Sequence, residues 1–275
     1  KNYLKAKLYL FENLIKKRGN IITDQLIPEF KKIKKITNNK KLKLLALNDK
    51  KNELKVIFHS FKGEAQLLKI KLNNSIQNLN LNLIGKIQLK NVLMAIIAAK
   101  NSNVSLDKIL NIISELKPVE GRFEKIGRIK NQSKVILDYA HTPDALKTCL
   151  LNLKEQFPNK KIAVLFGCGG NRDQNKRSKM GKIASVYADS IILTNDNPRL
   201  ENPEKIRRDI KKGIKKKKIT EIPNRAKAIL KAIHNLNSGD ILLIAGKGHE
   251  KTQDIGNKKI FFSDRKVILN AIKNK

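Results

Sequence analysis

Residues 161–199 read KIAVLFGCGGNRDQNKRSKMGKIASVYADSIILTNDNPR, a pattern typical of one strand–helix–strand unit. Residues 162–166 form a short apolar run that ends in a glycine-rich turn, which predicts a buried strand. Residues 178–188 carry apolar side chains at helical spacing, and residues 190–194 predict a second strand. Polar residues follow both strands. Because ligands of open α/β sheets bind outside the carboxyl ends of the strands, we expect a binding site there.

A third apolar strand, residues 241–245, is also followed by polar residues, here GKGHE at 246–250. The three strands would therefore bring arginine, aspartate, asparagine, histidine and glutamate side chains to one edge of the sheet. Groups of both charges at one edge indicate a site for a small zwitterion.

Two domains are expected. Residues 1–17 predict a helix with one buried face, residues 19–83 predict several short strands, and the segment from about residue 90 to 100 predicts an apolar helix. A proline and a glycine between residues 116 and 122 accompany a change of pattern.

This change places the domain boundary between 1–119 and 120–275. Beyond it strands alternate with helices, which predicts a three-layer αβα domain. Its remaining predicted elements are a strand at 134–137 and helices at 145–155, 203–212, 224–236 and 264–272.

The composition excludes some classes of protein. The chain lacks an apolar run of the ~18 residues that a transmembrane helix needs, so we expect no membrane insertion. It has only two cysteines, which suits a reducing cytoplasm. Its net charge of +35 invites a basic, non-catalytic nucleic-acid-binding protein as an alternative. The lysines are spread throughout, however, and aromatic residues make up only 5% of the chain. We therefore expect no nucleic-acid partner.

Single motifs do not identify a site. Arg172 stands where the third glycine of a dinucleotide-binding G-x-G-x-x-G would be. Around Lys247, Ile241 and Gly248 replace the first glycine and the serine or threonine of a phosphate loop. His141 has aspartates nearby, but no serine or cysteine lies in a nucleophile elbow, so a hydrolase triad is not favoured.

Five motifs taken together resemble those of the Mur ligase family, in the family's order. They are GRFE at 121–124, DYAHTPDA at 138–145, FGCGGNRD at 166–173, DNPR at 196–199 and AGKGHE at 245–250. The resemblance is strongest to the members that add meso-diaminopimelate, and folylpolyglutamate synthetase is more distant. It implies the C-terminal part of a P-loop-type central ATPase domain followed by a Rossmann-like three-layer αβα domain. The phosphate loop would then lie upstream of residue 1, and we expect the chain alone to be inactive.

The resemblance also implies roles for individual residues. Lys7, in Y-x-x-x-K-x-x-x-F, is similar to a catalytic lysine whose carbamate supports Mg²⁺ near ATP. Spacing alone favours a surface lysine at this position. The residues that the resemblance assigns to ATP are Gln88, Asn91, Arg122, Asp138 and His141. The asparagine-like position at Gln88 carries a longer amide than in the family.

A second set is implied to bind meso-diaminopimelate. It consists of Arg172, Asp196, Asn197, Pro198, Arg199, Gly246 and Glu250. These residue types suit the ligand, because a guanidinium can bind a carboxylate with two hydrogen bonds and a carboxylate can hold an ammonium group.

The implied reaction is an ATP-dependent amide ligation in peptidoglycan synthesis. ATP would phosphorylate the D-glutamate carboxylate of UDP-N-acetylmuramoyl-L-alanyl-D-glutamate, and the amine of meso-diaminopimelate would attack the acyl phosphate. We expect a cytoplasmic monomer. A Mur-type ligase that adds L-lysine or another amino acid is the alternative within the family.

Overall fold

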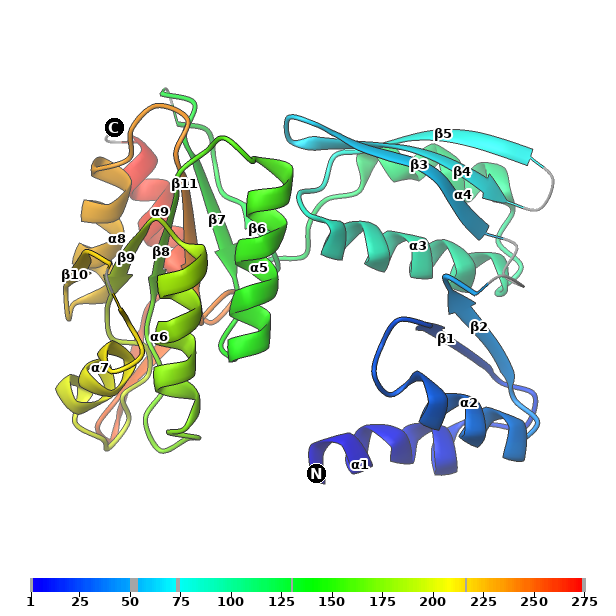
Figure 1. The fold of residues 1–275 in the computed structure, drawn as a ribbon, viewed down its shortest axis with the longest axis horizontal. Coiled ribbons are helices and arrows are strands. Elements are labelled where there is room, and N and C mark those ends of the chain that lie inside the picture. Colours follow the sequence, from blue (N-terminus) through cyan, green and yellow to red (C-terminus); the bar gives the residue numbers. More distant parts are fainter. Residues whose placement is uncertain (1, 50–53, 73–74, 130, 216, 274–275) are drawn as a thin grey trace. The chain divides into compact units, whose positions relative to one another are not determined.

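The structure, a computed structural model, describes residues 2–49, 54–72, 75–129, 131–215 and 217–273. The chain forms two compact units, Lys1–Lys117 and Pro118–Lys275 (Figure 1). Each unit is described by itself below.

Unit 1 contains two small sheets and several helices. Strands β1 (Asn20–Asp24) and β2 (Lys43–Leu47) pair in parallel, whereas β3 (Leu54–Lys62), β4 (Ala65–Leu72) and β5 (Ser75–Leu81) form an antiparallel sheet in the order β3-β4-β5. Its helices are α1 (Asn2–Tyr9), the π-helix η1 (Leu10–Leu14), α2 (Phe30–Asn39), α3 (Lys86–Lys100), α4 (Leu106–Ile112) and the 3₁₀-helix η2 (Ile113–Glu115).

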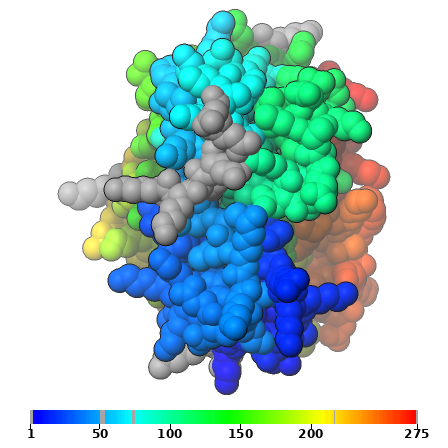
Figure 2. All heavy atoms as spheres, turned by 90° about the vertical axis from the view of Figure 1, so that its right-hand side faces the viewer, coloured from blue at the N-terminus to red at the C-terminus, as the bar shows by residue number. Residues whose placement is uncertain are grey.

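The core of unit 1 lies between the antiparallel sheet and α3. On β4, Leu68, Ile70 and Leu72 alternate with less buried residues, as expected for a strand with one face on a core. They pack against buried residues of α3 such as Leu93 and Ile96. Figure 2 shows the α4 segment (green) beside the strands of this sheet (cyan).

The N-terminal helix differs from the prediction. Helical structure ends at Leu14, residue 1 lies outside the described residues, and the predicted buried face is wrong. Leu10 and Leu14 are 47% and 63% exposed. Leu4, Leu8, Phe11 and Ile15 are half-buried, and η1 packs against the short helix α2. Helix α2 was not predicted, although its buried Phe30, Ile33 and Thr37 have helical spacing.

Unit 2 is built on a six-stranded sheet in the order β10-β9-β8-β11-β7-β6, parallel except for β6. The strands are β6 (Glu124–Lys125), β7 (Lys134–Asp138), β8 (Ile162–Phe166), β9 (Ser190–Leu193), β10 (Ile219–Glu221) and β11 (Ile241–Ala245). The helices are α5 (Pro143–Gln156), α6 (Lys176–Tyr187), α7 (Pro203–Lys211), α8 (Arg225–His234) and α9 (Asp264–Lys273). A hairpin of β12 (Thr252–Ile255) and β13 (Lys258–Phe261) lies outside the sheet.

Helices cover both faces of this sheet, which confirms the predicted three-layer αβα fold. Helices α5, α6 and α7 pack side by side on one face, and α8 packs against α9 on the other (Figure 1). The strands are apolar because both faces are buried, and every residue of β11 is buried. The short strands β6 and β10 were not predicted.

Strand order brings distant loops together. β11 is the last parallel strand in the sequence, yet it lies between β7 and β8. The strands β7 and β8 come earlier in the sequence than β11. The polar residues that follow β11 therefore lie between the loops that follow β7 and β8.

Candidate functional site

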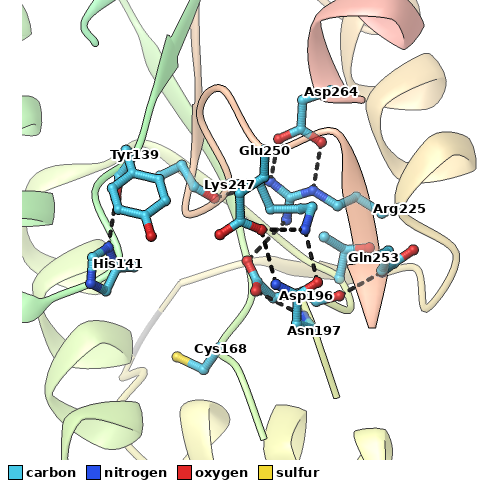
Figure 3. Close-up of polar contacts among 12 residues, drawn as sticks. Tyr139, His141, Cys168, Asp196, Asn197, Arg225, Lys247, Glu250, Gln253 and Asp264 are labelled. Atoms are coloured by element: carbon cyan, nitrogen blue, oxygen red, sulfur yellow. Dashed lines mark hydrogen bonds and ion pairs between the residues drawn. The ribbon is translucent and has the colours of Figure 1, made fainter. Parts of the chain in front are cut away.

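A polar cluster occupies the carboxyl edge of the sheet in unit 2 (Figure 3). Its side chains come from the loops after β9 and β11, from the hairpin strand β12, and from the first residues of α8 and α9. The structure therefore confirms that polar residues after separate strands meet at one edge.

The centre of the cluster is a buried lysine, Lys247. Its side chain is 0% exposed, and Nζ donates to Asn197 Oδ1 at 2.8 Å and to Glu250 Oε2 at 2.7 Å. Asn197 Nδ2 also donates to Glu250 Oε2, at 2.9 Å. Three side chains from two loops are thus joined in one hydrogen-bonded network, and Glu250 keeps 29% of its side chain exposed.

Glu250 is held ionised by this network. Burial acts to raise the pKa of Glu250, but the hydrogen bonds from Lys247 and Asn197 outweigh it and leave the pKa below the ordinary value. The positive charge of Arg225 acts in the same direction. At neutral pH the site therefore presents a partly exposed carboxylate.

The cluster also contains a buried ion pair between Arg225 and Asp264. Arg225 donates to both carboxylate oxygens of Asp264, each at 2.7 Å, and both side chains are fully buried. Among the described residues, the buried Arg225 Nη1 has no hydrogen-bond partner, and it lies 4.0 Å from Asp196 Oδ2. Gly246 lets this aspartate approach, because a Cβ at that position would lie 2.8 Å from Asp196 Oδ2.

Arg199 is held by the hairpin. Its backbone N–H donates to Asp254 O at 3.0 Å, its carbonyl accepts from Gly256 N at 2.7 Å, and its φ is 52°. The guanidinium donates from Nη1 to Gly170 O at 2.8 Å and keeps 27% of the side chain exposed. A left-handed φ at a non-glycine residue is uncommon, so the two backbone hydrogen bonds maintain this conformation.

Arg172 is exposed and lies on the loop after β8, whose glycines Gly167 and Gly170 are buried. A buried arginine, Arg177, braces this loop: it makes two 2.7 Å hydrogen bonds to Glu201, whose Oε2 also accepts from Asn171 N at 3.1 Å. The loop packs tightly on the DNPR segment, since a Cβ on Gly170 would lie 1.9 Å from Pro198 O.

Arg122 and His141 both contact the ring of Tyr139, and Asp138 is the residue before it. The Arg122 guanidinium lies 4.7 Å from the ring centroid, and the His141 ring lies edge-on at 4.6 Å. Asp138 accepts from Phe123 N at 2.7 Å. Burial raises the pKa of Asp138, against the hydrogen bond from Phe123 and the charge of Arg122.

Two Mur ligase domain families match the sequence. Residues 121–248 match the Mur ligase glutamate ligase domain, and residues 1–99 match the Mur ligase middle domain. The chain belongs to the Mur ligase family.

Curated relatives agree with this assignment. The chain is 41% identical over 273 residues to the UDP-N-acetylmuramoyl-L-alanyl-D-glutamate–2,6-diaminopimelate ligase of Rickettsia montanensis. The aligned residues cover 99% of this chain and 56% of the relative. It is 46% identical to the ligase of the same name from Buchnera aphidicola, over 72% of this chain and 39% of the relative. The chain thus spans about half the length of the first of these.

Solved structures agree on the fold. A ligase of the same name superposes with a TM-score of 0.65 at 30% identity, over 99% of this chain and 56% of the other. MurF from Acinetobacter baumannii superposes with a TM-score of 0.71 at 15% identity, over 99% of this chain and 55% of the other. The second similarity concerns the fold alone.

The remaining candidate residues lie in unit 1, the part that matches the Mur ligase middle domain. Lys7 is exposed, with Nζ 5.4 Å from the centroid of the Tyr3 ring. Gln88 is buried in the first turn of α3, and Asn91 is exposed one turn later. The Mur ligase resemblance assigns Lys7 to Mg²⁺ and the two amides to adenine, and the structure places Lys7 on α1 and the amides on α3.

The described residues include no group of three or more His, Cys, Asp or Glu side chains that could hold a metal ion. An unmodified lysine ammonium has no lone pair to ligate Mg²⁺. As an unmodified ammonium group, Lys7 is therefore not itself a Mg²⁺ ligand. None of the described helices is long and apolar enough to cross a membrane.

Several side chains of the polar cluster and its surroundings were not predicted from the sequence. These are Tyr139, Arg225, Lys247, Gln253 and Asp264. Lone arginines and lysines in a lysine-rich chain give no local signal of burial. Asn224 caps α8 and Ser263 precedes α9, and the buried Arg225 and Asp264 are the first residues of those helices.

Proposed function

We propose that this chain acts in the ATP-dependent addition of meso-diaminopimelate to UDP-N-acetylmuramoyl-L-alanyl-D-glutamate. The observation that carries the proposal is the cluster of opposite charges at the carboxyl edge of the unit 2 sheet. It supports a zwitterionic substrate, and relatives about 41% identical over 99% of the chain are named for this reaction.

The site has one group for each kind of charge on the amino acid. Glu250 offers an ionised carboxylate for an ammonium group, and Arg199 offers a partly exposed guanidinium for a carboxylate. L-lysine has the same straight chain but lacks the distal carboxylate, so Arg199 would keep only its protein neighbours, Gly170 O and the Asp254 carboxylate at 3.8 Å. The charges thus favour meso-diaminopimelate over lysine.

ATP is the proposed second ligand. Arg122 is suited to phosphate oxygens, and His141 lies beside it on the Tyr139 ring. Gln88 and Asn91 of α3 are the proposed contacts to adenine. In the proposed reaction these residues bind and orient ATP, which phosphorylates the D-glutamate carboxylate. The acyl phosphate then reacts with an amine of meso-diaminopimelate to give the amide and phosphate.

Mg²⁺ accompanies ATP in this proposal, and Lys7 is the proposed catalytic lysine. Its carbamate would replace a positive charge by a negative one that can attract Mg²⁺. Mass spectrometry of the chain in bicarbonate buffer, with Lys7→Arg as the control, should show a carbamate at this position. Its absence under conditions in which the ligase is active contradicts the assignment. We propose that the protein works as a monomer in the cytoplasm.

The substrate assignment can be tested by calorimetry on residues 1–275. We expect meso-diaminopimelate to bind, and L-lysine to bind about tenfold or more weakly, because a charge-assisted hydrogen bond contributes ~1.5–3 kcal/mol. Equal affinity for both amino acids would favour a Mur-type ligase of another specificity.

A further inference from the structure

We propose that Lys247 is a positioning residue that orients Asn197 and Glu250 so that Glu250 can receive an ammonium group of the substrate. The proposal deepens the proposed function and rests on it. None of the motif assignments gives Lys247 a role, although it lies between Gly246 and Gly248 in the sequence.

The hydrogen bonds determine which way the Asn197 amide faces. Its Oδ1 accepts from Lys247 Nζ at 2.8 Å and from the backbone N–H of Asp254 at 3.1 Å. Both partners can only donate, so Oδ1 must face them. The amide nitrogen is therefore directed at Glu250 Oε2, 2.9 Å away.

The same network divides the two oxygens of Glu250 between protein and ligand. Among the described residues, the hydrogen bonds from Lys247 and Asn197 both fall on Oε2. Oε1 is thus left for a ligand, on a side chain that is 29% exposed. One carboxylate oxygen is anchored and the other can accept from an ammonium group (Figure 3).

Lys247 is buried at a cost that a structural role alone does not require. Burying an ammonium group is unfavourable unless it is paired and hydrogen-bonded, and an apolar side chain would fill the same space at less cost. What an apolar residue could not do is direct both polar neighbours. The charged groups that face Glu250 are Lys247 from its own loop and Arg225 from α8. Arg225 is itself paired with Asp264 and lies near Asp196.

The test uses Lys247→Met and Lys247→Gln in the chain of residues 1–275. Methionine keeps the length and removes the charge and the donors, whereas glutamine keeps a donor without the charge. The matched control is Lys211→Met, which removes the ion pair between Lys211 and Glu221. This pair has a distance of 2.6 Å, close to the 2.7 Å of Lys247 and Glu250, but its side chains are 41% and 27% exposed. Circular dichroism establishes that each variant is folded.

The first readout needs no ligand. The carboxyl carbon of Glu250, assigned with Glu250→Gln, is titrated by NMR. We expect its pKa to rise in Lys247→Met, to rise less in Lys247→Gln, and to stay at the wild-type value in Lys211→Met. An unchanged titration of Glu250 in a folded Lys247→Met chain overturns the proposal.

The second readout is calorimetric affinity for meso-diaminopimelate as a function of pH. We expect a loss of about tenfold or more in Lys247→Met that deepens as the pH falls, because Glu250 then becomes protonated at a higher pH than in the wild type. A uniform loss at every pH contradicts the positioning role. If the wild-type chain does not bind meso-diaminopimelate, the proposed function fails, while the NMR titration still decides the role of Lys247. If neither variant folds, Lys247 is a folding residue and the proposal is wrong.

Discussion

The buried pair of Arg225 and Asp264 should stabilise unit 2 only as a pair. Both side chains are 0% exposed, and two hydrogen bonds of 2.7 Å join them. Asp264→Ala leaves the guanidinium buried, with Asp196 at 4.0 Å and the carbonyl of Ala245 at 3.1 Å as its remaining neighbours. Removing one partner of a buried pair costs ~3–5 kcal/mol, because the other charge stays uncompensated.

This loss is large against the ~5–15 kcal/mol that a domain has in total. For a domain of this size it corresponds to a fall in Tm of about 6–20 °C. The double variant Arg225→Met, Asp264→Leu removes both charges together. We expect it to be more stable than Asp264→Ala, since replacing a buried pair by apolar residues is often neutral or stabilising.

The assay is urea unfolding followed by far-UV circular dichroism, since the chain has no tryptophan to report by fluorescence. Arg208→Ala is the control, because its pair with Glu204 has a distance of 3.9 Å and both side chains are at least 64% exposed. We expect this control to lose less than ~1 kcal/mol. If Asp264→Ala costs no more than Arg208→Ala, the pair does not stabilise the fold as argued here.

Three further predictions concern the DNPR loop and the cysteines. Arg199→Ala should weaken binding of meso-diaminopimelate about tenfold or more and bring its affinity close to that of L-lysine, measured by calorimetry; an unchanged preference would place selectivity elsewhere. Gly170→Ala should lower Tm and weaken the binding of meso-diaminopimelate, because its Cβ would lie 1.9 Å from a carbonyl oxygen of the DNPR loop. The control Gly63→Asn, in open space at φ 60°, should change neither Tm nor this binding. Burial raises the pKa of Cys168 to about 12 and that of Cys149 well above its ordinary value. Both cysteine thiols should therefore resist a thiol reagent at pH 8 in the folded chain and react once the chain is unfolded; fast labelling of the folded chain would contradict this. The free energy of unfolding should fall as the pH rises from about 9 toward 12, because in this range the thiols lose protons only in the unfolded chain.

Much of unit 2 follows from local pattern. The predicted strand at 162–166 is β8 (Ile162–Phe166), and the helix predicted at 178–188 is α6 (Lys176–Tyr187). Such strands are apolar along their whole length because both faces are buried, so they stand out in a lysine-rich chain. The short edge strands β6 and β10 carry no such signal and were missed.

In unit 1 local pattern was less reliable. The N-terminal segment has apolar residues at helical spacing and is helical, yet Leu10 and Leu14 are largely exposed. Periodicity reports which residues share a face, but burial depends on what packs against that face. That information is non-local.

The sequence by itself determined the family, the αβα class of unit 2 and the polar residues that follow its strands, because each is written in a short run of neighbouring residues. The tertiary structure alone decided that β11 pairs with β8, one strand away from β9, and that Glu250 after β11 reaches Asn197 after β9. It also decided that Lys247 and Arg225 are buried cations, paired across 50 and 39 residues with Asn197 and Asp264. A lysine or arginine has the same side chain on the surface and in the core, and only the groups that folding places around it determine which role it has.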